Sequence, residues 1–188
     1  MKQDSRIHLR AFGPALSILG LALLAGCATI PANDCERFER IRQSMDYDTT
    51  YVYSEAETSR AAPRFAKPPR GAHTAVAWYT LRASPARIRA CDHLYLVKDL
   101  YLQRIGNETS LEERREFYTA DGHLIATKRE NLTRQLRKPG YYTALVPLPI
   151  PEQAPPGTYR VVMRFVGNPG TRAERVLAET SAEFRVLR

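Results

Sequence analysis

Beyond the first ten residues the sequence holds three histidines, His73, His93 and His123, the side chains best suited to acid–base chemistry. None has a second His, or a Glu at helical spacing, that would resemble a metal site. Asp92 and His93 are adjacent, but neighbouring side chains of a strand point to opposite faces. A Ser-His-Asp site can still assemble from distant residues. No nucleophile elbow or phosphate-binding loop is present, so the sequence predicts a non-enzymatic protein without cofactor or metal.

Paired carboxylates are the second kind of residue that could carry chemistry. Glu112 and Glu113 are neighbours, and Arg114 and Arg115 follow them directly. This mixture of signs is typical of a solvated charged face, and we expect no acid pair here.

The third chemical feature is Cys27, which ends an apolar run near the N-terminus. The first ten residues are polar with a net positive charge, and the apolar residues 11–25 are interrupted by two glycines and a proline. That run is shorter than the roughly 20 residues that cross a bilayer comfortably. A basic start, a short apolar segment and a small-residue end are typical of a cleaved signal peptide.

The stretch Leu23-Leu24-Ala25-Gly26-Cys27 resembles the lipobox of bacterial lipoproteins. The resemblance implies cleavage before Cys27 and lipidation of that cysteine, with a diacylglycerol thioether and an N-acyl chain. Ala28 follows the cysteine in place of Asp, which by the sorting pattern of this class implies the outer membrane, on its periplasmic face. The alternative is a plain signal peptide or an uncleaved anchor.

Lipidation of Cys27 leaves Cys35 and Cys91, an even pair in an oxidising compartment. We therefore expect a disulfide between them, which in the chain-entropy model stabilises the fold by roughly 4 kcal/mol less any strain. Two buried thiols are the alternative. A metal pair is disfavoured, because no further ligand stands at the required spacing beside either cysteine.

Length and charge limit the remaining classes. The 188 residues carry a formal charge of +8, spread along the chain with acidic residues between the basic ones. Such a surface is mostly solvated, with a bias toward acidic partners such as lipid head groups. Nucleic acid is a poor candidate for an exported chain.

We divide the chain into a signal peptide (1–26), a lipidated N-terminal tether (27–73) and a β-sandwich domain (74–188). Asn33 and Glu36 resemble a capped helix start, and apolar residues recur at helical intervals as far as Met45. This short helix either packs on the domain or binds a partner. Residues 55–73, rich in Pro and Arg, indicate a flexible basic loop.

Residues from 74 onward follow a period of two, as strands do. Strands are expected over residues 74–81, 93–104, 141–148, 159–165 and 176–186. Asp121-Gly122 predicts a hairpin turn that sets Phe117 opposite Ala126 and Tyr118 opposite Ile125. Prolines at 147, 149 and 151 favour an edge position for the strand over 141–148.

About seven short strands without helices between them predict a mainly β fold, a single β-sandwich with one short N-terminal helix. The entry Pro-Pro-Gly-X-Tyr-Arg-Val at 155–161 is similar to the late strands of immunoglobulin-like and fibronectin type III modules. A transthyretin-like sandwich is the alternative topology.

We expect an outer-membrane lipoprotein that binds or scaffolds another envelope component, a protein or a glycan. An envelope hydrolase and a small-ligand or lipid carrier are the alternatives. A carrier needs an apolar cavity between the sheets, whereas the large inward residues Tyr159, Met163 and Phe165 indicate a filled core.

Overall fold

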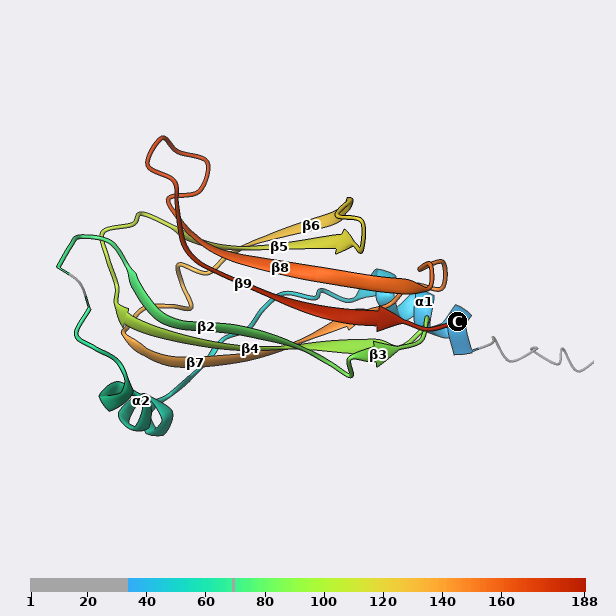
Figure 1. Cartoon of the computed structure of the whole chain (residues 1–188), viewed down its shortest axis with the longest axis horizontal. Coiled ribbons are helices and arrows are strands. Elements are labelled where there is room, and N and C mark those ends of the chain that lie inside the picture. Colours follow the sequence, from blue (N-terminus) through green and yellow to red (C-terminus); the bar gives the residue numbers. More distant parts are fainter. Residues whose placement is uncertain (1–33, 69) are drawn as a thin grey trace, which may run out of the picture. The chain divides into compact units, whose positions relative to one another are not determined.

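The structure is a computed structural model that describes residues 34–68 and 70–188. The predicted signal peptide, lipidation at Cys27 and the sorting position Ala28 lie outside these residues. Within the described part of the chain the fold is mainly β, with two sheets that face each other (Figure 1). The prediction of a mainly β, two-sheet fold is confirmed.

The first sheet has the strand order β1-β7-β4-β2 and the second the order β3-β9-β8-β5-β6. The first sheet consists of β1 (Val52–Ser54), β7 (Gly140–Pro149), β4 (His93–Arg104) and β2 (Ala75–Ser84). The second consists of β3 (Arg87–Ile88), β9 (Arg175–Val186), β8 (Gly157–Gly167), β5 (Leu111–Thr119) and β6 (Leu124–Asn131). The described residues thus form nine strands where about seven were expected. Strand β1 lies within residues 46–54, whose Tyr51, Val52 and Tyr53 favour an isolated strand, whereas β3 carried no clear periodic signal.

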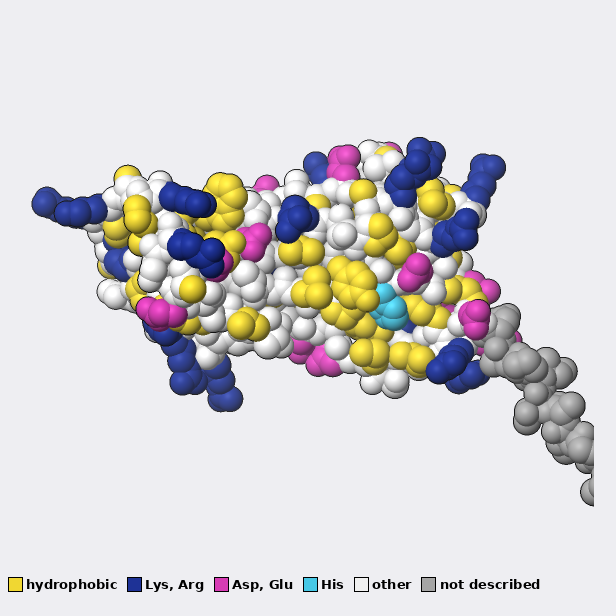
Figure 2. Space-filling view, turned by 90° about the horizontal axis from the view of Figure 1, so that it is seen from below, with side chains coloured by type: hydrophobic (Ala, Val, Ile, Leu, Met, Phe, Trp, Pro, Cys, Tyr) yellow, Lys and Arg dark blue, Asp and Glu magenta, His cyan; other side chains and the backbone are white. Residues whose placement is uncertain are grey.

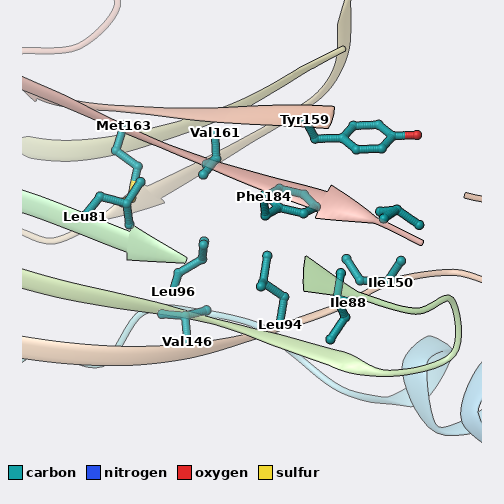
Figure 3. Close-up of a cluster of buried hydrophobic side chains, with 11 residues drawn as sticks. Leu81, Ile88, Leu94, Leu96, Val146, Ile150, Tyr159, Val161, Met163 and Phe184 are labelled. Carbon is teal, nitrogen blue, oxygen red and sulfur yellow. The ribbon is translucent and has the colours of Figure 1, made fainter. Parts of the chain in front are cut away.

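The core lies between the two sheets, as alternating apolar residues of both inner faces require. Four leucines of β4, at positions 94, 96, 100 and 102, are fully buried, which confirms the strand predicted over 93–104. Opposite them β8 buries Tyr159, Val161, Met163 and Phe165, as predicted. Figure 3 shows the cluster toward one end of the sandwich, with Leu94 and Leu96 facing Val161 and Phe184.

The hairpin between β5 and β6 forms around Asp121-Gly122, as the turn signal predicts, and Phe117 pairs with Ala126. The second predicted pair is wrong, because Tyr118 pairs with Leu124 and not with Ile125. The register shifts between Phe117 and Tyr118, which leaves Ile125 as the extra residue of a β-bulge.

Strand β7 lies between β4 and β1, but β1 covers only Tyr141, Tyr142 and Thr143. From residue 144 onward no described strand pairs with the other side of β7. Pro147 and Pro149 lie in this uncovered part, where a missing N–H costs no ladder hydrogen bond. The edge prediction therefore holds for the second half of the strand only.

Two helices precede the long strands. Helix α1 (Asp34–Ser44) confirms the predicted short N-terminal helix, although it has no buried residue. Helix α2 (Glu55–Ala61) and a 3-10 turn follow β1, in a segment expected to be a loop. The side-chain oxygen of Ser54 accepts from the Glu57 backbone N–H, and Arg60 pairs with Glu57. Capping and charge pairing thus form a helix that apolar periodicity could not reveal.

Figure 2 shows the outer face of the first sheet, with hydrophobic side chains gathered over its middle and Lys and Arg mostly toward its ends. The large hydrophobic residues exposed on the strands of this sheet are Val52, Trp78, Tyr95 and Leu145. The described residues contain no helix long and apolar enough to cross a bilayer.

Candidate functional site

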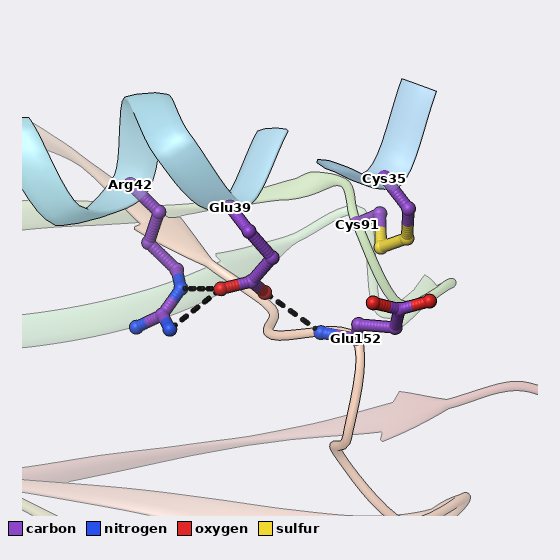
Figure 4. Close-up of a disulfide and its surroundings, with 5 residues drawn as sticks. All are labelled: Cys35, Glu39, Arg42, Cys91 and Glu152. Atoms are coloured by element: carbon purple, nitrogen blue, oxygen red, sulfur yellow. Dashed lines mark hydrogen bonds and ion pairs between the residues drawn. A yellow bond between two sulfur atoms is a disulfide. The ribbon is translucent and has the colours of Figure 1, made fainter. Parts of the chain in front are cut away.

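The predicted cysteine pair joins α1 to the loop before β4. Cys35 and Cys91 form a disulfide with a Cα–Cα distance of 5.2 Å, so the two-thiol alternative is wrong. Figure 4 shows the disulfide beside a second contact of α1, in which the Glu152 backbone N–H donates to the Glu39 carboxylate at 2.9 Å. Arg42 also pairs with Glu39 at 2.7 Å, and this ion pair is the main cause of the lowered pKa of Glu39. The start of the described chain is thereby fixed to one end of the sandwich.

The three histidines do not meet one another. The His73 ring lies 3.2 Å from the Glu108 carboxylate, and it is half-exposed. Thr74 donates both its backbone N–H and its hydroxyl to the same carboxylate. These two bonds outweigh the effect of burial and lower the pKa of Glu108. The Thr74 hydroxyl therefore bonds to the acid and not to the imidazole, unlike the nucleophile of a catalytic triad.

Neither of the other two histidine rings lies within ion-pair distance of a carboxylate of the described residues. The His93 ring packs on Phe38 of α1, with ring centroids 4.9 Å apart. His123 follows the hairpin turn and is exposed.

A cavity of about 440 Å³ opens at the end of the sandwich to which α1 is fixed. We call it the end pocket; it is bounded by the end of β5, the start of β6, the β7–β8 connection and the end of β9. Its walls are almost entirely apolar, with Thr119 and Gln153 as the polar exceptions. The main contributors are Phe117, Ile125, Leu148, Ile150, Tyr159 and Phe184. Figure 3 shows Tyr159, Phe184 and Ile150 near this end of the core.

A ring stack and several hydrogen bonds hold the inner wall of the end pocket in place. The rings of Tyr159 and Phe184 stack with centroids 5.5 Å apart, and the Tyr159 hydroxyl donates to the Pro155 carbonyl at 2.6 Å. Ile150 bonds through its backbone to Cys91 and Asp92. The loop that carries the disulfide and the connection that lines the pocket are thus joined directly.

The outer wall depends on the β-bulge at Ile125. In a regular strand Ile125 and Ala126 would point to opposite faces. Because Ile125 is the extra residue, both border the end pocket, and Ile125 remains 50% exposed. Sequence reasoning missed the pocket because an unbulged hairpin turns Ile125 outward.

Three arginines, Arg87, Arg185 and Arg188, lie beside the end pocket; we call them the arginine cluster. They line a second hollow of about 370 Å³, which shares Val186 with the end pocket. Arg87 and Arg185 are direct partners in the parallel pairing of β3 with β9, and the next pair in register, Ile88 and Val186, is buried. Both arginines therefore point to the outer side, where none of the three forms an ion pair with any described acidic residue.

A network of charged residues is buried between the sheets, midway along the sandwich. It contains Lys98 of β4, Glu113 and Arg115 of β5, Glu130 of β6 and, from the segment before β1, Thr49. We call these five residues the buried ion-pair network. Lys98 pairs with Glu113, and Arg115 pairs with Glu130 at 2.6 Å. The prediction of a solvated face over 112–115 is wrong for two of its residues, because strand alternation turns Glu113 and Arg115 inward beside Leu111 and Phe117.

Hydroxyl groups complete the buried ion-pair network. Tyr51 and Tyr79 donate to the Glu113 carboxylate at 2.6 and 2.9 Å, and Thr49 donates to Glu130 at 2.8 Å. Burial lowers the pKa of Lys98 to about 8, although the Glu113 carboxylate opposes this shift. The pKa of Glu113 is lowered in spite of its burial, because Lys98 and the donors around it favour the anion. The network is enclosed, and neither of the two hollows at the end of the sandwich reaches it.

No protein-family model matches this chain, and no curated protein matches it. Among solved structures, the C-terminal domain of wzt aligns with a TM-score of 0.46 and 10% identity over 68% of this chain and 85% of that one. The CARDB domain of the PF1109 protein from Pyrococcus furiosus aligns at 0.40 and 10% over 63% and 97%. The alkylpurine DNA glycosylase AlkC from Pseudomonas fluorescens aligns at 0.41 and 18%, over 65% of this chain and 32% of that one. These similarities are too distant to carry a functional argument.

Proposed function

We propose that this protein is a lipid-anchored lipoprotein on the periplasmic face of the bacterial outer membrane. Its sandwich acts there as a non-enzymatic binding module for another envelope component. The lipobox resemblance at Leu23–Cys27 supports the anchor, and Cys35, eight residues after Cys27, supports its connection to the domain. A tether raises the effective concentration of the domain for partners close to the membrane.

One observation carries the binding role: α1 is fixed by the disulfide and by Glu39 to the same end of the sandwich that holds the end pocket. An apolar cavity of this size is a typical ligand site. In this proposal the tethered end is the binding end. Within residues 34–68 and 70–188, the hydrolase alternative is favoured by the His73–Glu108 pair alone, and there the Thr74 hydroxyl bonds to the carboxylate and not to the imidazole.

We also propose an immunoglobulin-like topology. Of the seven longer strands, β2, β4 and β7 lie in one sheet and β5, β6, β8 and β9 in the other. In chain order these are the first, second and fifth strands against the third, fourth, sixth and seventh. The constant-type immunoglobulin arrangement has the same division except for its fourth strand, which belongs to the other sheet. The transthyretin-like alternative is not supported by a comparable match.

The anchor is tested by Cys27→Ala in the full chain, followed by membrane fractionation and washing at high salt. We expect the variant to move to the soluble fraction, whereas the double variant Cys35→Ser/Cys91→Ser stays with the membrane. Ala28→Asp should shift the protein to the inner-membrane fraction. Retention of Cys27→Ala on washed membranes would refute lipid anchoring.

The binding role is tested by affinity purification of the lipidated protein from its own membranes. Stoichiometric recovery of an envelope protein, glycan or lipid is the expected result. Repeated recovery of the protein alone counts against a binding module.

A further inference from the structure

The end pocket and the arginine cluster lie next to each other and have complementary chemistry. The cavity of about 440 Å³ is apolar, and the hollow beside it is lined by three arginines. The two share Val186, and Pro155 of the first is followed in the chain by Pro156 of the second. We propose that together they bind one anionic phospholipid that bends round the end of β9 at Val186. Its acyl chain lies in the end pocket, on the inner side of the second sheet, and its phosphate lies on Arg87 and Arg185, on the outer side. This inference rests on the proposed function.

The volume of the end pocket suits an acyl chain. An engineered apolar cavity of about 150 Å³ accommodates the six carbons of benzene. A cavity three times larger therefore accommodates a chain of roughly a dozen carbons or more. The wall residues differ in exposure, from the buried Tyr159 and Phe184 to the half-exposed Ile125. A flexible acyl chain can follow a wall of this kind from the core to the surface.

The arginine cluster supplies the anion specificity. Arg87 and Arg185 face each other across adjacent strands, and like charges in such positions destabilise a sheet. Glu183 lies on the same exposed face of β9 as Arg185, but it forms no ion pair with either arginine. A bound anion can therefore supply the counter-charge that the described acidic residues do not. Guanidinium groups bind phosphate through paired N–H donors. The same arginines repel the quaternary ammonium of a choline head group, so the cluster favours an anionic head group over a zwitterionic one.

The position of the site indicates the membrane as the source of the ligand. Cys91 is bonded to Cys35 and also donates its backbone N–H to the carbonyl of Ile150, a wall residue of the end pocket. Cys35 follows Cys27 by eight positions, a span of at most about 28 Å when the chain is fully extended. Lipid attached to Cys27 would therefore keep the pocket close to the leaflet that supplies its ligand.

The test uses the full chain carrying Cys27→Ala, so that binding does not depend on the anchor. The probe is phosphatidylglycerol with a fluorescent acyl chain, presented in phosphatidylcholine vesicles at about 100 mM salt, and fluorophore shielding reports uptake. We expect at least tenfold stronger uptake than for phosphatidylcholine that carries the same fluorophore. Arg87→Gln/Arg185→Gln should remove this preference, and Ile125→Asp should weaken the uptake of both lipids.

Two control variants lie at the opposite end of the second sheet. Arg172→Gln/Arg175→Gln removes two exposed arginines, and Val176→Asp places a charge on a side chain as exposed as Ile125. Both controls should bind phosphatidylglycerol like the parent, and circular dichroism should show that all variants are folded.

Four results would overturn the proposal: no uptake by the parent, unchanged uptake in folded Ile125→Asp, unchanged preference in Arg87→Gln/Arg185→Gln, or equal binding of a fatty acid without phosphate. Vesicle binding without shielding of the fluorophore would identify a surface contact and would also overturn it. Because the assay is independent of Cys27, failure here leaves the anchor intact. Retention of Cys27→Ala on washed membranes would refute only the anchor.

Discussion

Replacing Lys98 with Met tests how much the buried ion-pair network contributes to stability. The Lys98 side chain is completely buried, and its ammonium donates to Glu113 and to the Thr49 hydroxyl at 2.6 Å. Met fills a similar volume but removes the charge. The variant leaves the Glu113 carboxylate buried with Tyr51 and Tyr79 as its donors and no cation in direct contact.

Breaking a buried ion pair by removing one partner costs about 3–5 kcal/mol of unfolding free energy. Lys98→Met should fall in this range, because the Glu113 carboxylate has no access to water. Glu113→Gln should cost less, since Lys98 already has a lowered pKa and can release its proton. The double variant Lys98→Met/Glu113→Gln should cost about 0.5–3 kcal/mol less than the sum of the two single changes.

Urea denaturation at pH 7, followed by circular dichroism and by the fluorescence of Trp78, measures these differences. Lys128→Met is the matched control: Lys128 lies on β6 and pairs with Asp48 at 2.6 Å, but it is partly exposed. Such a pair contributes about 0.2–1 kcal/mol. Our reasoning fails if Lys98→Met costs no more than Lys128→Met, or if the double variant equals the sum of the single ones.

Three further outcomes are expected. The free energy of unfolding should rise from pH 8 to pH 9.5 by at most about 1.4 kcal/mol per pH unit. In this range Lys98 keeps its proton in the unfolded chain, where its pKa is the ordinary 10.5, but has released it in the folded protein. Urea midpoints measured as a function of pH check this, and a rise of the same size in Lys98→Met would contradict it. Removing the disulfide through Cys35→Ser/Cys91→Ser should cost about 2–5 kcal/mol in urea unfolding, and a loss below about 1 kcal/mol would show that it constrains little. Gly106→Ala should cost about 1–3 kcal/mol of unfolding free energy, because a Cβ at this position would overlap the backbone between His73 and Thr74. Gly157→Ala should be nearly neutral, because a Cβ at that position would have no atom within 4 Å. Equal melting temperatures of the two variants would disprove the overlap.

Local signals accounted for much of the fold. The Asp121-Gly122 turn predicted the hairpin, the alternation through Tyr159 and Phe165 predicted β8, and the Leu-X-Leu spacing after His93 predicted β4. In each case the pattern depends on residues close together in the chain. The cysteine pair was predictable for a different reason, since an even number of thiols in an oxidising compartment leaves a single pairing.

Features that depend on distant segments were not predictable. Arg87 and Arg185 meet only because the short strand β3 pairs with the end of β9, and no local pattern indicates that contact. The end pocket needs a one-residue bulge at Ile125, which follows from packing and not from the turn. Glu113 and Arg115 lie two and four positions before Phe117 and therefore on the same, inward face of β5, so strand alternation alone predicts that they are buried. Their charge favours exposure to solvent. The buried ion-pair network provides partners for both charges and thereby overrides that preference.

The position of Thr49 in the buried ion-pair network has a consequence for the order of folding. Thr49 and Glu130 are 81 residues apart, and Tyr51 and Gln135, which bond beside them, are 84 apart. Contacts of this separation form late, because a long loop must close first. On a chain that emerges N-terminus first, the segment around Thr49 must therefore wait until β6 is present. The segment before β1 is thus among the first parts of the described chain to be made, but it takes its place between the sheets only after β6 has been added.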